Sequence, residues 1–256
     1  MISVCIATHN GEKYIRQQLE SILSQLGNND EVIVSDDGST DNTLSVIEGL
    51  NDKRITVYPF SQPSYTRHPH EYVCRNFQNA LMHAKGDFIF LSDQDDIWLP
   101  YKVEVCLKDL ENHDMVLHEF KHIDDNETVI RERHYDGTFR PKNYFLRVGK
   151  HYGCAMAFRR SVLDYALPFP EHLLLHDYWL GILSETLGRF CYEETPLLLY
   201  RIHHENTSNT NNSLFFKIKY RVETFAWVAL RVAACKLGVH SGKKKLNHNY
   251  ICKQLY

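Results

Sequence analysis

Residues 88–100 read FIFLSDQDDIWLP, an apolar run of strand length that leads directly into three carboxylates. The apolar run follows Gly86 and predicts a buried strand. The carboxylates would then lie at the carboxyl end of that strand, where open α/β sheets bind their ligands. Mg²⁺ takes oxygen ligands, commonly one or two carboxylates together with substrate phosphates. The segment predicts either a metal site that holds a phosphate-bearing substrate or a solvated acidic turn.

Three earlier segments show the same alternation of an apolar run and a helical pattern. Strands are expected at residues 2–7, 31–35 and 55–58, and helices at about 12–26, 44–50 and 73–84. Strands and helices that alternate in this way predict right-handed βαβ crossovers and a parallel sheet. Asp37 directly follows the second expected strand, so we expect it at the same sheet edge as the carboxylates.

The following segment predicts an α+β half that forms a second wall. Its expected strands are 115–120, 129–133, 152–158, 190–193 and 197–200, and its expected main helices run from about 101 to 112 and from about 173 to 188. We therefore divide the chain into a domain of residues 1–208, with halves 1–100 and 101–208, and a tail of residues 209–256.

The tail begins with a polar linker and continues as an expected amphipathic helix. Its apolar stripe at helical spacing consists of Leu214, Ile218, Val222, Phe225, Ala229 and Val232. Basic residues lie among its other faces, and a run of three lysines follows at 243–245. A basic amphipathic helix can lie on an anionic membrane, here through residues 214–245. The alternative is a helix that packs on its own domain or on a second copy in a homo-oligomer.

Composition excludes several classes of protein. The chain has 256 residues, a net charge of −3 and a pI near 6.6, so there is no basic signature of nucleic-acid binding. The seven cysteines are scattered without CxxC spacing, which favours reduced thiols in a cytosolic protein. No basic region precedes the first strand, and no uncharged apolar run reaches the roughly 18 residues of a spanning helix. We expect a cytoplasmic protein, free or peripheral on the inner face of the plasma membrane.

Several motifs together resemble those of one enzyme family. They are THN at 8–10, DDGSTD at 36–41, SDQDDIWLP at 92–100, HDYWL at 176–180 and YRIH at 200–203. In this order they resemble glycosyltransferase family 2, whose members are inverting enzymes with a GT-A fold and nucleotide-sugar donors. The DQDDIW and HDYW versions are similar to a bacterial branch of rhamnosyltransferases and relatives that build surface polysaccharide such as capsule and O-antigen.

The resemblance implies a fold and an activity for residues 1–208. The fold would be α/β, with a Rossmann-like, mainly parallel sheet, helices on both faces and a C-terminal helical extension. Residues 1–100 would bind the nucleotide and residues 101–208 the acceptor. The activity would be metal-dependent transfer of a hexose or deoxyhexose from a UDP- or dTDP-sugar to a glycan or lipid-linked saccharide.

The resemblance also assigns the metal and the diphosphate. The DxD motif of the family falls on Asp93-Gln94-Asp95, so Asp95 would bind Mg²⁺ or Mn²⁺ and Asp93 would lie near the ribose or the metal. His203 matches a histidine that completes the metal site in some GT-A enzymes; the alternative is a surface histidine without such a role. Arg201 could pair with the diphosphate as a bidentate donor, and its alternative is a salt bridge at the rim. Asp96 either supports the motif or caps a helix.

The nucleoside side of the donor site follows in the same way. Asp37 matches the carboxylate that accepts a hydrogen bond from a pyrimidine imide N–H; the alternative is a turn residue before Gly38. Many family members have tyrosine where this chain has His9. The expected donor-binding residues are Thr8, His9, Asn10, Asp37, Gly38, Asn76, Asp93, Gln94 and Arg201.

The acceptor side is assigned to the HDYWL segment. Asp177 is the expected general base, which would take the proton from the acceptor hydroxyl; its alternative is to cap the following helix. His176 stands where many members have glutamate and would contact the acceptor. Trp98 and Trp179 could shape a sugar pocket, with core packing as the alternative.

Two other functions compete with glycosyl transfer. A sugar nucleotidyltransferase would need a glycine-rich phosphate loop near the N-terminus, and the first turn has only Gly11. A non-catalytic nucleotide-sugar-binding or scaffold protein would be expected to lack some of Asp37, Asp95 and Asp177, and all three are present. Glycosyl transfer is therefore the favoured hypothesis.

Overall fold

The computed structural model describes residues 1–62, 68–136, 139, 151–203 and 214–239. Its main elements, in chain order, are β1 (Ile2–Thr8), α1 (Ile15–Leu23), β2 (Glu31–Asp36), α2 (Thr43–Glu48), β3 (Ile55–Pro59), α3 (Pro69–His83), β4 (Phe88–Ser92), β5 (Ile97–Trp98), α4 (Lys102–Leu110), β6 (Met115–Ile123), β7 (Val129–Arg131), η2 (Gly153–Ala155), β8 (Met156–Arg159), α5 (Ser161–Ala166), α6 (His176–Leu187), β9 (Phe190–Arg201) and α7 (Leu214–Lys236).

One mixed sheet joins both halves of the domain. Its strand order is β3-β2-β1-β4-β8-β6-β9-β5, and β7 pairs with β6. The first four strands are parallel, β8 is antiparallel to β4 and to β6, and β9 is parallel to β6. The predicted α/β fold is confirmed, and the β4–β8 pairing makes the sheet continuous between residues 1–100 and 101–208.

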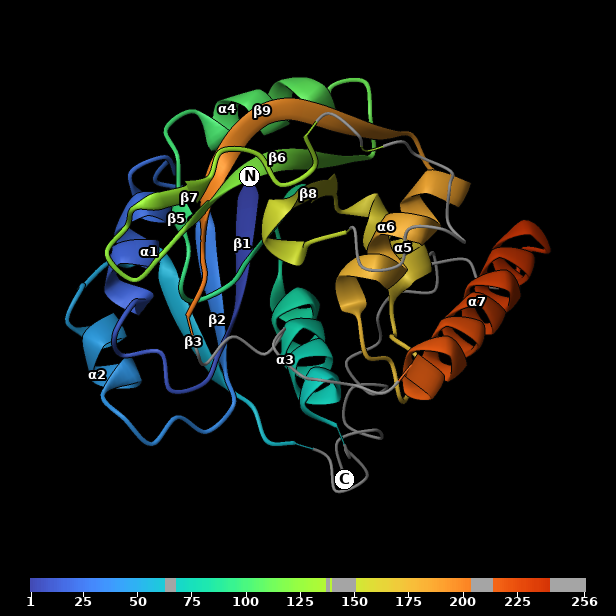
Figure 1. Cartoon of the computed structure of the whole chain (residues 1–256), viewed down its shortest axis with the longest axis horizontal. Coiled ribbons are helices and arrows are strands. Elements are labelled where there is room, and N and C mark those ends of the chain that lie inside the picture. Colours follow the sequence, from blue (N-terminus) through green and yellow to red (C-terminus); the bar gives the residue numbers. More distant parts are fainter. Residues whose placement is uncertain (63–67, 137–138, 140–150, 204–213, 240–256) are drawn as a thin grey trace.

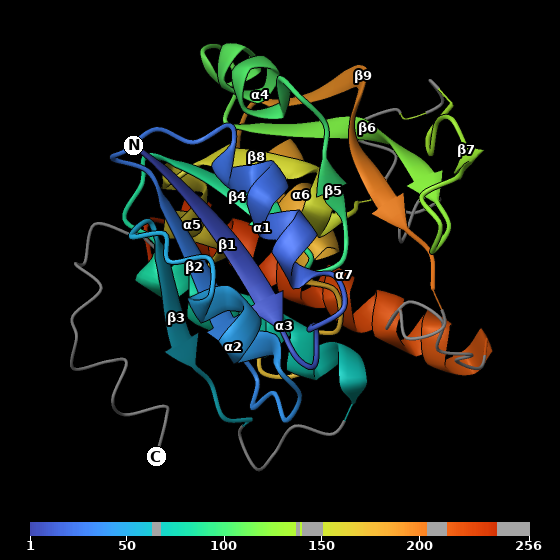
Figure 2. The same cartoon turned by 90° about the vertical axis from the view of Figure 1, so that its left-hand side faces the viewer.

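The inner parallel strands β1, β2 and β4 are mainly apolar because helices cover both faces of the sheet. Helices α1 and α2 lie on one face, and α3, α5 and α6 lie on the other (Figures 1 and 2). Strands β1, β2 and β4 are almost entirely buried, which is the physical reason for their uninterrupted apolar runs. Because the strands and helices pack in layers, the ends of neighbouring strands are fixed relative to one another.

The carboxyl ends of β1, β2 and β4 meet at one edge, as the alternation predicted. Thr8 pairs with Asp36 in register, and Ile6 pairs with Ser92. The main-chain N–H of Asp37 donates to the carbonyl of Thr8 at 2.9 Å. The loops that follow these strands therefore lie side by side.

Two predicted segments differ in the structure. Residues 152–158 were expected to form one strand, but they form a 3-10 turn, η2, followed by the shorter β8. The turn brings Gly153 against α6, where an added Cβ would lie 2.9 Å from Nε2 of His176. The two strands expected at 190–193 and 197–200 form the single strand β9. Its pairing with β6 shifts register beside Pro196, because proline cannot donate to the ladder and is tolerated at such an irregularity.

Helix α7 exists where it was predicted, but its apolar faces are arranged differently. It packs on α6 at the periphery of the molecule (Figure 1). Tyr220, Thr224 and Val228 are buried in this contact, whereas Val222 and Ala229 of the predicted stripe are exposed. The body of the protein therefore covers one face of α7, and a second apolar face points outward. Among the described residues, no helix is both long enough and apolar enough to cross a membrane.

Candidate active site

The acidic loop of residues 93–96 lies between β4 and β5 at the common sheet edge. The carboxylate of Asp95 pairs with His203, a residue from the far end of the domain. Its Oδ2 lies 2.7 Å from Nε2 of that histidine. Both side chains are mostly buried, at 14% and 7% exposed. The structure therefore brings together two of the residues predicted to bind metal.

Arg201 fastens the acidic loop to β9. Its main-chain N–H donates to Oδ1 of Asp96 at 3.0 Å, and its Nε donates to the carbonyl of Asp95 at 3.0 Å. Its Nη2 donates to Gln17 of α1 at 2.9 Å, and the side chain is 2% exposed. The guanidinium, for which we expected either the diphosphate or a salt bridge at the rim, is buried against the main chain of the loop and pairs with the half-exposed Glu127 at 3.6 Å.

A buried lysine lies behind the same loop, and our sequence analysis missed it. Lys102 is fully buried, donates from Nζ to the carbonyl of Cys154 at 2.7 Å and lies 4.2 Å from the centre of the Trp98 ring. Burial lowers its pKa to about 8, against the opposing charges of Asp96 and Asp93. Helical spacing places Lys102 on the same face as the buried residues at 106 and 110, which is the signal that could have revealed it.

The electrostatics of the loop are those of a crowded anionic site. Burial, followed by the charges of Asp95 and Asp177, raises the pKa of Asp93 to about 7. Burial and its acidic neighbours raise the pKa of Asp96 well above its usual range. One oxygen of Asp96, Oδ2, is buried without a hydrogen-bond partner. Such a cluster favours a nearby cation, which would offset the repulsion between its carboxylates.

Two groups of side chains, each with members in this loop and one from outside it, could hold a metal ion. Ligand atoms of Asp93, Asp96 and Cys154 lie within 4.8 Å of one another. Burial raises the pKa of the Cys154 thiol well above its usual value, so this group offers a protonated sulfur, a poor ligand for a hard cation. The Asp95–His203 pair offers a carboxylate oxygen and an imidazole nitrogen, both of which suit Mn²⁺, and the carboxylate suits Mg²⁺. The residues present therefore fit a divalent cation, and Asp95 is the best placed of the three aspartates.

Gln94 links the acidic loop to the end of β1. Its Oε1 accepts hydrogen bonds from Oγ1 of Thr8 at 2.6 Å and from the main-chain N–H of His9 at 3.0 Å. Its Nε2 donates to the carbonyl of His9 at 3.2 Å. An added Cβ at Gly11 would lie 2.5 Å from Oε1 of Gln94, so a larger residue there would displace the Gln94 amide from this position. Gln94 thus couples the predicted nucleoside side to the predicted metal side.

The residues predicted on the nucleoside side lie together at the ends of β1 and β2. Nδ1 of His9 is 2.8 Å from the carbonyl of Asp37, and the carboxylate of Asp37 accepts from Gln62. Burial raises the pKa of Asp37. Gly38 has a φ of 65°, a left-handed conformation that favours glycine. The main-chain N–H of Asn10 donates to Oγ of Ser39 at 2.9 Å, which joins the two loops.

Asn76 of α3 contacts the carboxyl end of β1 from the face of the sheet opposite to α1 and α2 (Figure 2). Its Nδ2 donates to the carbonyl of Thr8 at 3.2 Å, and the side chain is 3% exposed. Its Oδ1 is buried without a hydrogen-bond partner. The contact supports the end of β1 from behind.

Asp177 lies in the first turn of α6, near the acidic loop. Burial raises its pKa to about 6, and its Oδ1 accepts from the main-chain N–H of Tyr178 at 2.7 Å. Its charge is also one of the causes of the raised pKa of Asp93. The alternative prediction, that Asp177 is the N-cap of the helix, is wrong, because Leu175 holds that position and Asp177 lies inside α6. A main-chain hydrogen bond from Gly153 also reaches the Asp177 carboxylate and opposes the rise of its pKa.

His176 is placed between α3 and the η2 turn. Its ring stacks on Phe77 at 4.2 Å between centroids, and its Nδ1 lies 3.8 Å from Sγ of Cys74. Burial lowers its pKa to about 3, so the imidazole is neutral at pH 7. Its Nε2 is buried without a partner and faces Gly153. His176 is thus a packed neighbour of the predicted base.

The two tryptophans predicted to shape a sugar pocket lie in the core. Trp98 is 3% exposed and packs on Phe90 at 5.5 Å between ring centroids. Trp179 is fully buried, and its Nε1 donates to the carbonyl of Ala166 at 2.9 Å. Both rings are packed in the core, which was the alternative prediction. Neither has an exposed face that a sugar could contact.

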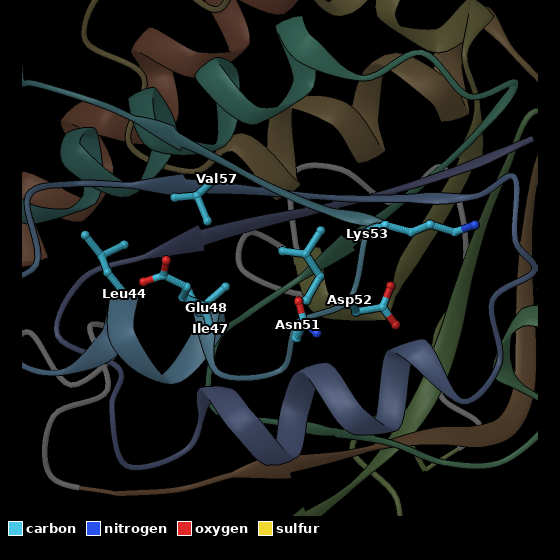
Figure 3. A pocket seen from close by; sticks show the side chains of 8 residues that line it. Leu44, Ile47, Glu48, Asn51, Asp52, Lys53 and Val57 are labelled. Carbon is cyan, nitrogen blue, oxygen red and sulfur yellow. The ribbon is translucent and has the colours of Figure 1, made fainter.

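A hollow of about 470 Å³ lies elsewhere on the molecule, between α2 and the edge strand β3 (Figure 3). Leu44, Ile47 and Val57 supply its apolar surface, and residues 51–53 supply most of its polar rim. None of the residues predicted for the active site lines it. The acidic edge, and not this hollow, carries the chemical groups of a catalytic site.

The sheet and its acidic carboxyl edge define an open α/β protein of the kind in which ligands bind beyond the strand ends. A model of glycosyl transferase family 2 matches residues 3–166. This is more than half of the chain, and the chain belongs to that family. The family predicted from the motifs is confirmed.

Two relatives of known activity are similar over most of this chain. The dTDP-rhamnosyl transferase RfbG of Shigella flexneri is 27% identical over 231 residues, which are 84% of this chain and 77% of that protein. WfaP of Escherichia coli, a UDP-Glc:alpha-D-GlcNAc-diphosphoundecaprenol beta-1,3-glucosyltransferase, is 29% identical over 218 residues, covering 81% of this chain and 80% of that protein. An uncharacterized glycosyltransferase of Nostoc, alr2836, is matched over only 66% of its own length.

Two solved structures share the fold. S. aureus TarS 1-349 in complex with UDP-GlcNAc has a TM-score of 0.63 at 20% identity, covering 90% of this chain and 66% of that chain. The mannosyltransferase PcManGT from Pyrobaculum calidifontis, in complex with GDP-Man and Mn²⁺, has a TM-score of 0.59 at 18% identity, covering 91% and 73%. At these identities the likeness establishes the fold alone, which is the predicted glycosyltransferase fold.

Proposed function

We propose that this chain transfers a sugar from a nucleoside-diphosphate sugar to a hydroxyl of a glycan or a lipid-linked saccharide. The observation that carries the proposal is the placement of Asp177 beside the acidic loop. Asp177 has a raised pKa, and its charge acts on Asp93. A carboxylate whose pKa approaches neutrality, next to a site for an anionic diphosphate, is suited to general-base catalysis.

In the proposed reaction, Asp177 accepts the proton of the acceptor hydroxyl while the hydroxyl oxygen attacks the anomeric carbon of the donor. The bond between that carbon and the diphosphate oxygen breaks, and the nucleoside diphosphate leaves with the bonding electrons. Attack on the face opposite the leaving group inverts the anomeric configuration. A positioned base typically contributes about 10²–10⁴-fold to such a step.

Asp95, Asp93 and His203 would hold the Mg²⁺ or Mn²⁺ ion. When bound, such an ion offsets the charge of the diphosphate and of the departing nucleotide. Support comes from the chemistry of the Asp95–His203 pair and from the Mn²⁺ in the complex of PcManGT. Arg201 and Lys102 would act from beneath the loop, keeping the carboxylates in place as the charge of the diphosphate changes.

The nucleoside would bind over the ends of β1 and β2. Asp37 would accept the imide N–H of a pyrimidine, with residues 8–10, Gly38 and Asn76 completing the site. The proposal is supported by the clustering of these residues and by the donors of the relatives RfbG and WfaP, which are dTDP- and UDP-sugars. UDP or dTDP is therefore the proposed nucleotide, and a hexose or deoxyhexose the proposed sugar.

The proposed setting is bacterial surface polysaccharide synthesis, such as capsule or O-antigen. The acceptor of WfaP is a saccharide on diphosphoundecaprenol, a membrane lipid. The outward face of α7 favours a location at the inner membrane surface. Val222, Leu230 and Leu237 are 64%, 69% and 78% exposed there, and with exposed alanines at 226, 229 and 233 they form one helical arc. Lys219 and Lys236 lie near its ends, the pattern of a helix that lies on an anionic bilayer.

A screen of nucleotide sugars tests the proposal. The full chain is incubated with UDP-, dTDP- and GDP-sugars and Mn²⁺, and release of the nucleoside diphosphate is measured. We expect hydrolysis of at least one pyrimidine nucleotide sugar, and loss of it in Asp95→Ala. Formation of pyrophosphate from a nucleoside triphosphate and a sugar 1-phosphate would instead identify a nucleotidyltransferase. Nucleotide binding without any turnover would favour a binding or scaffold protein.

A further inference from the structure

A cluster of aromatic side chains lies beside the predicted base, on strands β6 and β9 and the segments that pack on them. The cluster, here called the aromatic wall, consists of Phe120, His122, His134, Tyr152 and Tyr200. Tyr152 lies 4.5 Å from His134, 5.1 Å from Phe120 and 5.8 Å from Tyr200 between ring centroids. Phe120 is fully buried and is the innermost ring of the wall, whereas Tyr152, Tyr200 and His134 are only partly buried.

The wall depends on pairing between distant parts of the chain. His122 of β6 and Tyr200 of β9 are register partners in the parallel ladder, so their rings lie on one face of the sheet, 5.5 Å apart. Nε2 of His122 is 2.8 Å from Nδ1 of His134, which fixes one imidazole against the other. Beneath them, the buried carboxylate of Glu119 accepts from the main-chain N–H groups of His134 and Tyr135. The segment that carries His134 is thereby held against β6.

The wall adjoins Asp177. Tyr152 directly precedes Gly153, and a Cβ on Gly153 would lie 3.7 Å from the Cβ of Asp177. The carboxylate of Asp177 acts on Tyr152, whose pKa is raised to about 12, first by burial and then by this charge. The same carboxylate acts on Asp93 of the acidic loop. Asp177 thus has both the donor site and the aromatic wall as neighbours.

We propose that the aromatic wall is the acceptor subsite, where Tyr152, Tyr200 and His134 contact the apolar face of a neutral acceptor sugar next to Asp177. This inference rests on the proposed function, because a base that adjoins the donor site must also adjoin the acceptor hydroxyl. A pyranose has C–H groups on its faces and hydroxyls around its edge. Tyrosine and histidine have an apolar ring and a polar tip, so a cluster of them matches both parts.

The charge of the wall favours a neutral sugar. Burial lowers the pKa of His122, followed by the charge of Arg131, so His122 is neutral at pH 7. Arg131 is itself paired with Asp136 at 2.8 Å. Among the described residues, Asp177 and Glu119 are two acidic groups that adjoin the wall, and they would repel a carboxylate or sulfate on the acceptor. The subsite therefore discriminates against acidic sugars.

Saturation-transfer NMR with methyl hexopyranosides tests the inference directly. The full chain, with UDP and Mn²⁺ present, is titrated with the methyl glycosides of glucose, N-acetylglucosamine, rhamnose and glucuronic acid. We expect saturation of ring C–H protons in at least one neutral glycoside and weaker saturation in the glucuronide. Tyr152→Ala and Tyr200→Ala should weaken binding about threefold to tenfold, the value of one aromatic contact. Tyr152→Phe keeps the ring and should retain most of the signal.

Two controls separate the subsite from general packing. Tyr58→Ala removes a tyrosine that stacks on His83 at 3.8 Å at the other edge of the sheet, and it should leave glycoside binding unchanged. The shift in melting temperature caused by UDP and Mn²⁺ should persist in every variant, which shows that the donor side is folded. Absence of glycoside binding in the natural chain, or unchanged binding in both alanine variants, would overturn the acceptor subsite. Loss of the UDP response in the natural chain, with glycoside binding intact, would overturn the proposed function instead.

Discussion

Asp95 and His203 lie 2.7 Å apart although they belong to a loop after β4 and to the residues after β9. The acidic motif of a single loop therefore becomes a site only when the last strand of the sheet is in place. Arg201, two residues before His203, holds the same loop through the carbonyl of Asp95. Arg201, which holds the loop, and His203, which pairs with Asp95, thus come from the end of β9 and the residues directly after it.

The Asp95–His203 pair predicts a metal-dependent response to nucleotide. UDP at about 100 times its dissociation constant, with Mn²⁺, should stabilise the natural chain by about 2.7 kcal/mol and raise its melting temperature by about 5–10 °C. Asp95→Asn should abolish the Mn²⁺-dependent part of this shift, and His203→Ala should reduce it. Differential scanning fluorimetry with and without EDTA measures both effects. His83→Ala, whose ring stacks on Tyr58 at the other edge of the sheet, is the matched control. An undiminished Mn²⁺ response in Asp95→Asn would show that the cation binds elsewhere.

Asp177→Asn should separate binding from chemistry. The amide keeps the shape of the side chain and can still accept from the N–H of Tyr178, so the UDP and Mn²⁺ shift should be unchanged. It cannot take a proton, so the rate of transfer should fall about 10²–10⁴-fold. Single-turnover transfer to the best acceptor, followed by chromatography of the product, measures the loss. A rate within a factor of three of the natural chain would rule out Asp177 as the base.

The raised pKa of Asp177 has two consequences with opposite signs. Because the base acts only when ionised, kcat/KM should rise with pH and level off above about 6. The same ionisation weakens the fold, because a carboxyl group whose folded pKa exceeds its unfolded value near 4 is penalised above that range. Asp177→Asn should therefore be more stable than the natural chain at pH 7.5, by on the order of 1 kcal/mol, and this advantage should shrink as the pH falls toward 4. Urea unfolding of both proteins at several pH values measures the stability of the variant relative to the natural chain. A relative stability that is lower at pH 7.5 than at pH 4.5 would contradict the prediction.

We expect the buried positive charge of Lys102 to stabilise the acidic loop. Lys102→Met should destabilise the fold by on the order of 3 kcal/mol at pH 7.5, because Asp93 and Asp96 lose their buried positive neighbour. The deficit should be smaller at pH 5, where Asp93, whose pKa is raised to about 7, is protonated and no longer needs the positive neighbour. Lys108→Met, an exposed lysine on the same helix, is the control and should cost less than about 0.5 kcal/mol. An equal deficit at both pH values would mean that Lys102 contributes only packing.

The parallel half of the sheet could be predicted because its signals are local. Strands β1, β2 and β4 are buried on both faces, so each is a continuous apolar run followed by a polar turn. From that alternation follows the common edge where Asp37 and the acidic loop meet. The predicted grouping of Asp95 with His203 depended on the family resemblance, because no local pattern links residues so far apart in the sequence.

The second half of the domain could be predicted less well because its geometry depends on long-range pairing. The register between β6 and β9 brings His122 and Tyr200 together, and nothing in either strand alone indicates it. Trp98 and Trp179 were assigned to a sugar pocket from their position in the motifs, yet their rings fill the core. Lys102 shows the reverse error: a charged residue that looks solvated in the sequence is fully buried, and only its helical spacing gives a hint.

The outward face of α7 predicts binding to an anionic membrane. The full chain should sediment with vesicles of phosphatidylglycerol and phosphatidylethanolamine, and less with neutral phosphatidylcholine vesicles or at high salt. Leu230→Glu and Leu237→Glu place charges within the apolar arc and should each weaken sedimentation about tenfold or more, because burial of a leucine contributes about 1.5–3 kcal/mol. Ile130→Glu on β7, where the natural side chain is 55% exposed, is the control and should have no effect. If the natural chain ignores vesicles but forms a dimer that Leu230→Glu disrupts, the arc is an interface between copies and the membrane proposal is wrong.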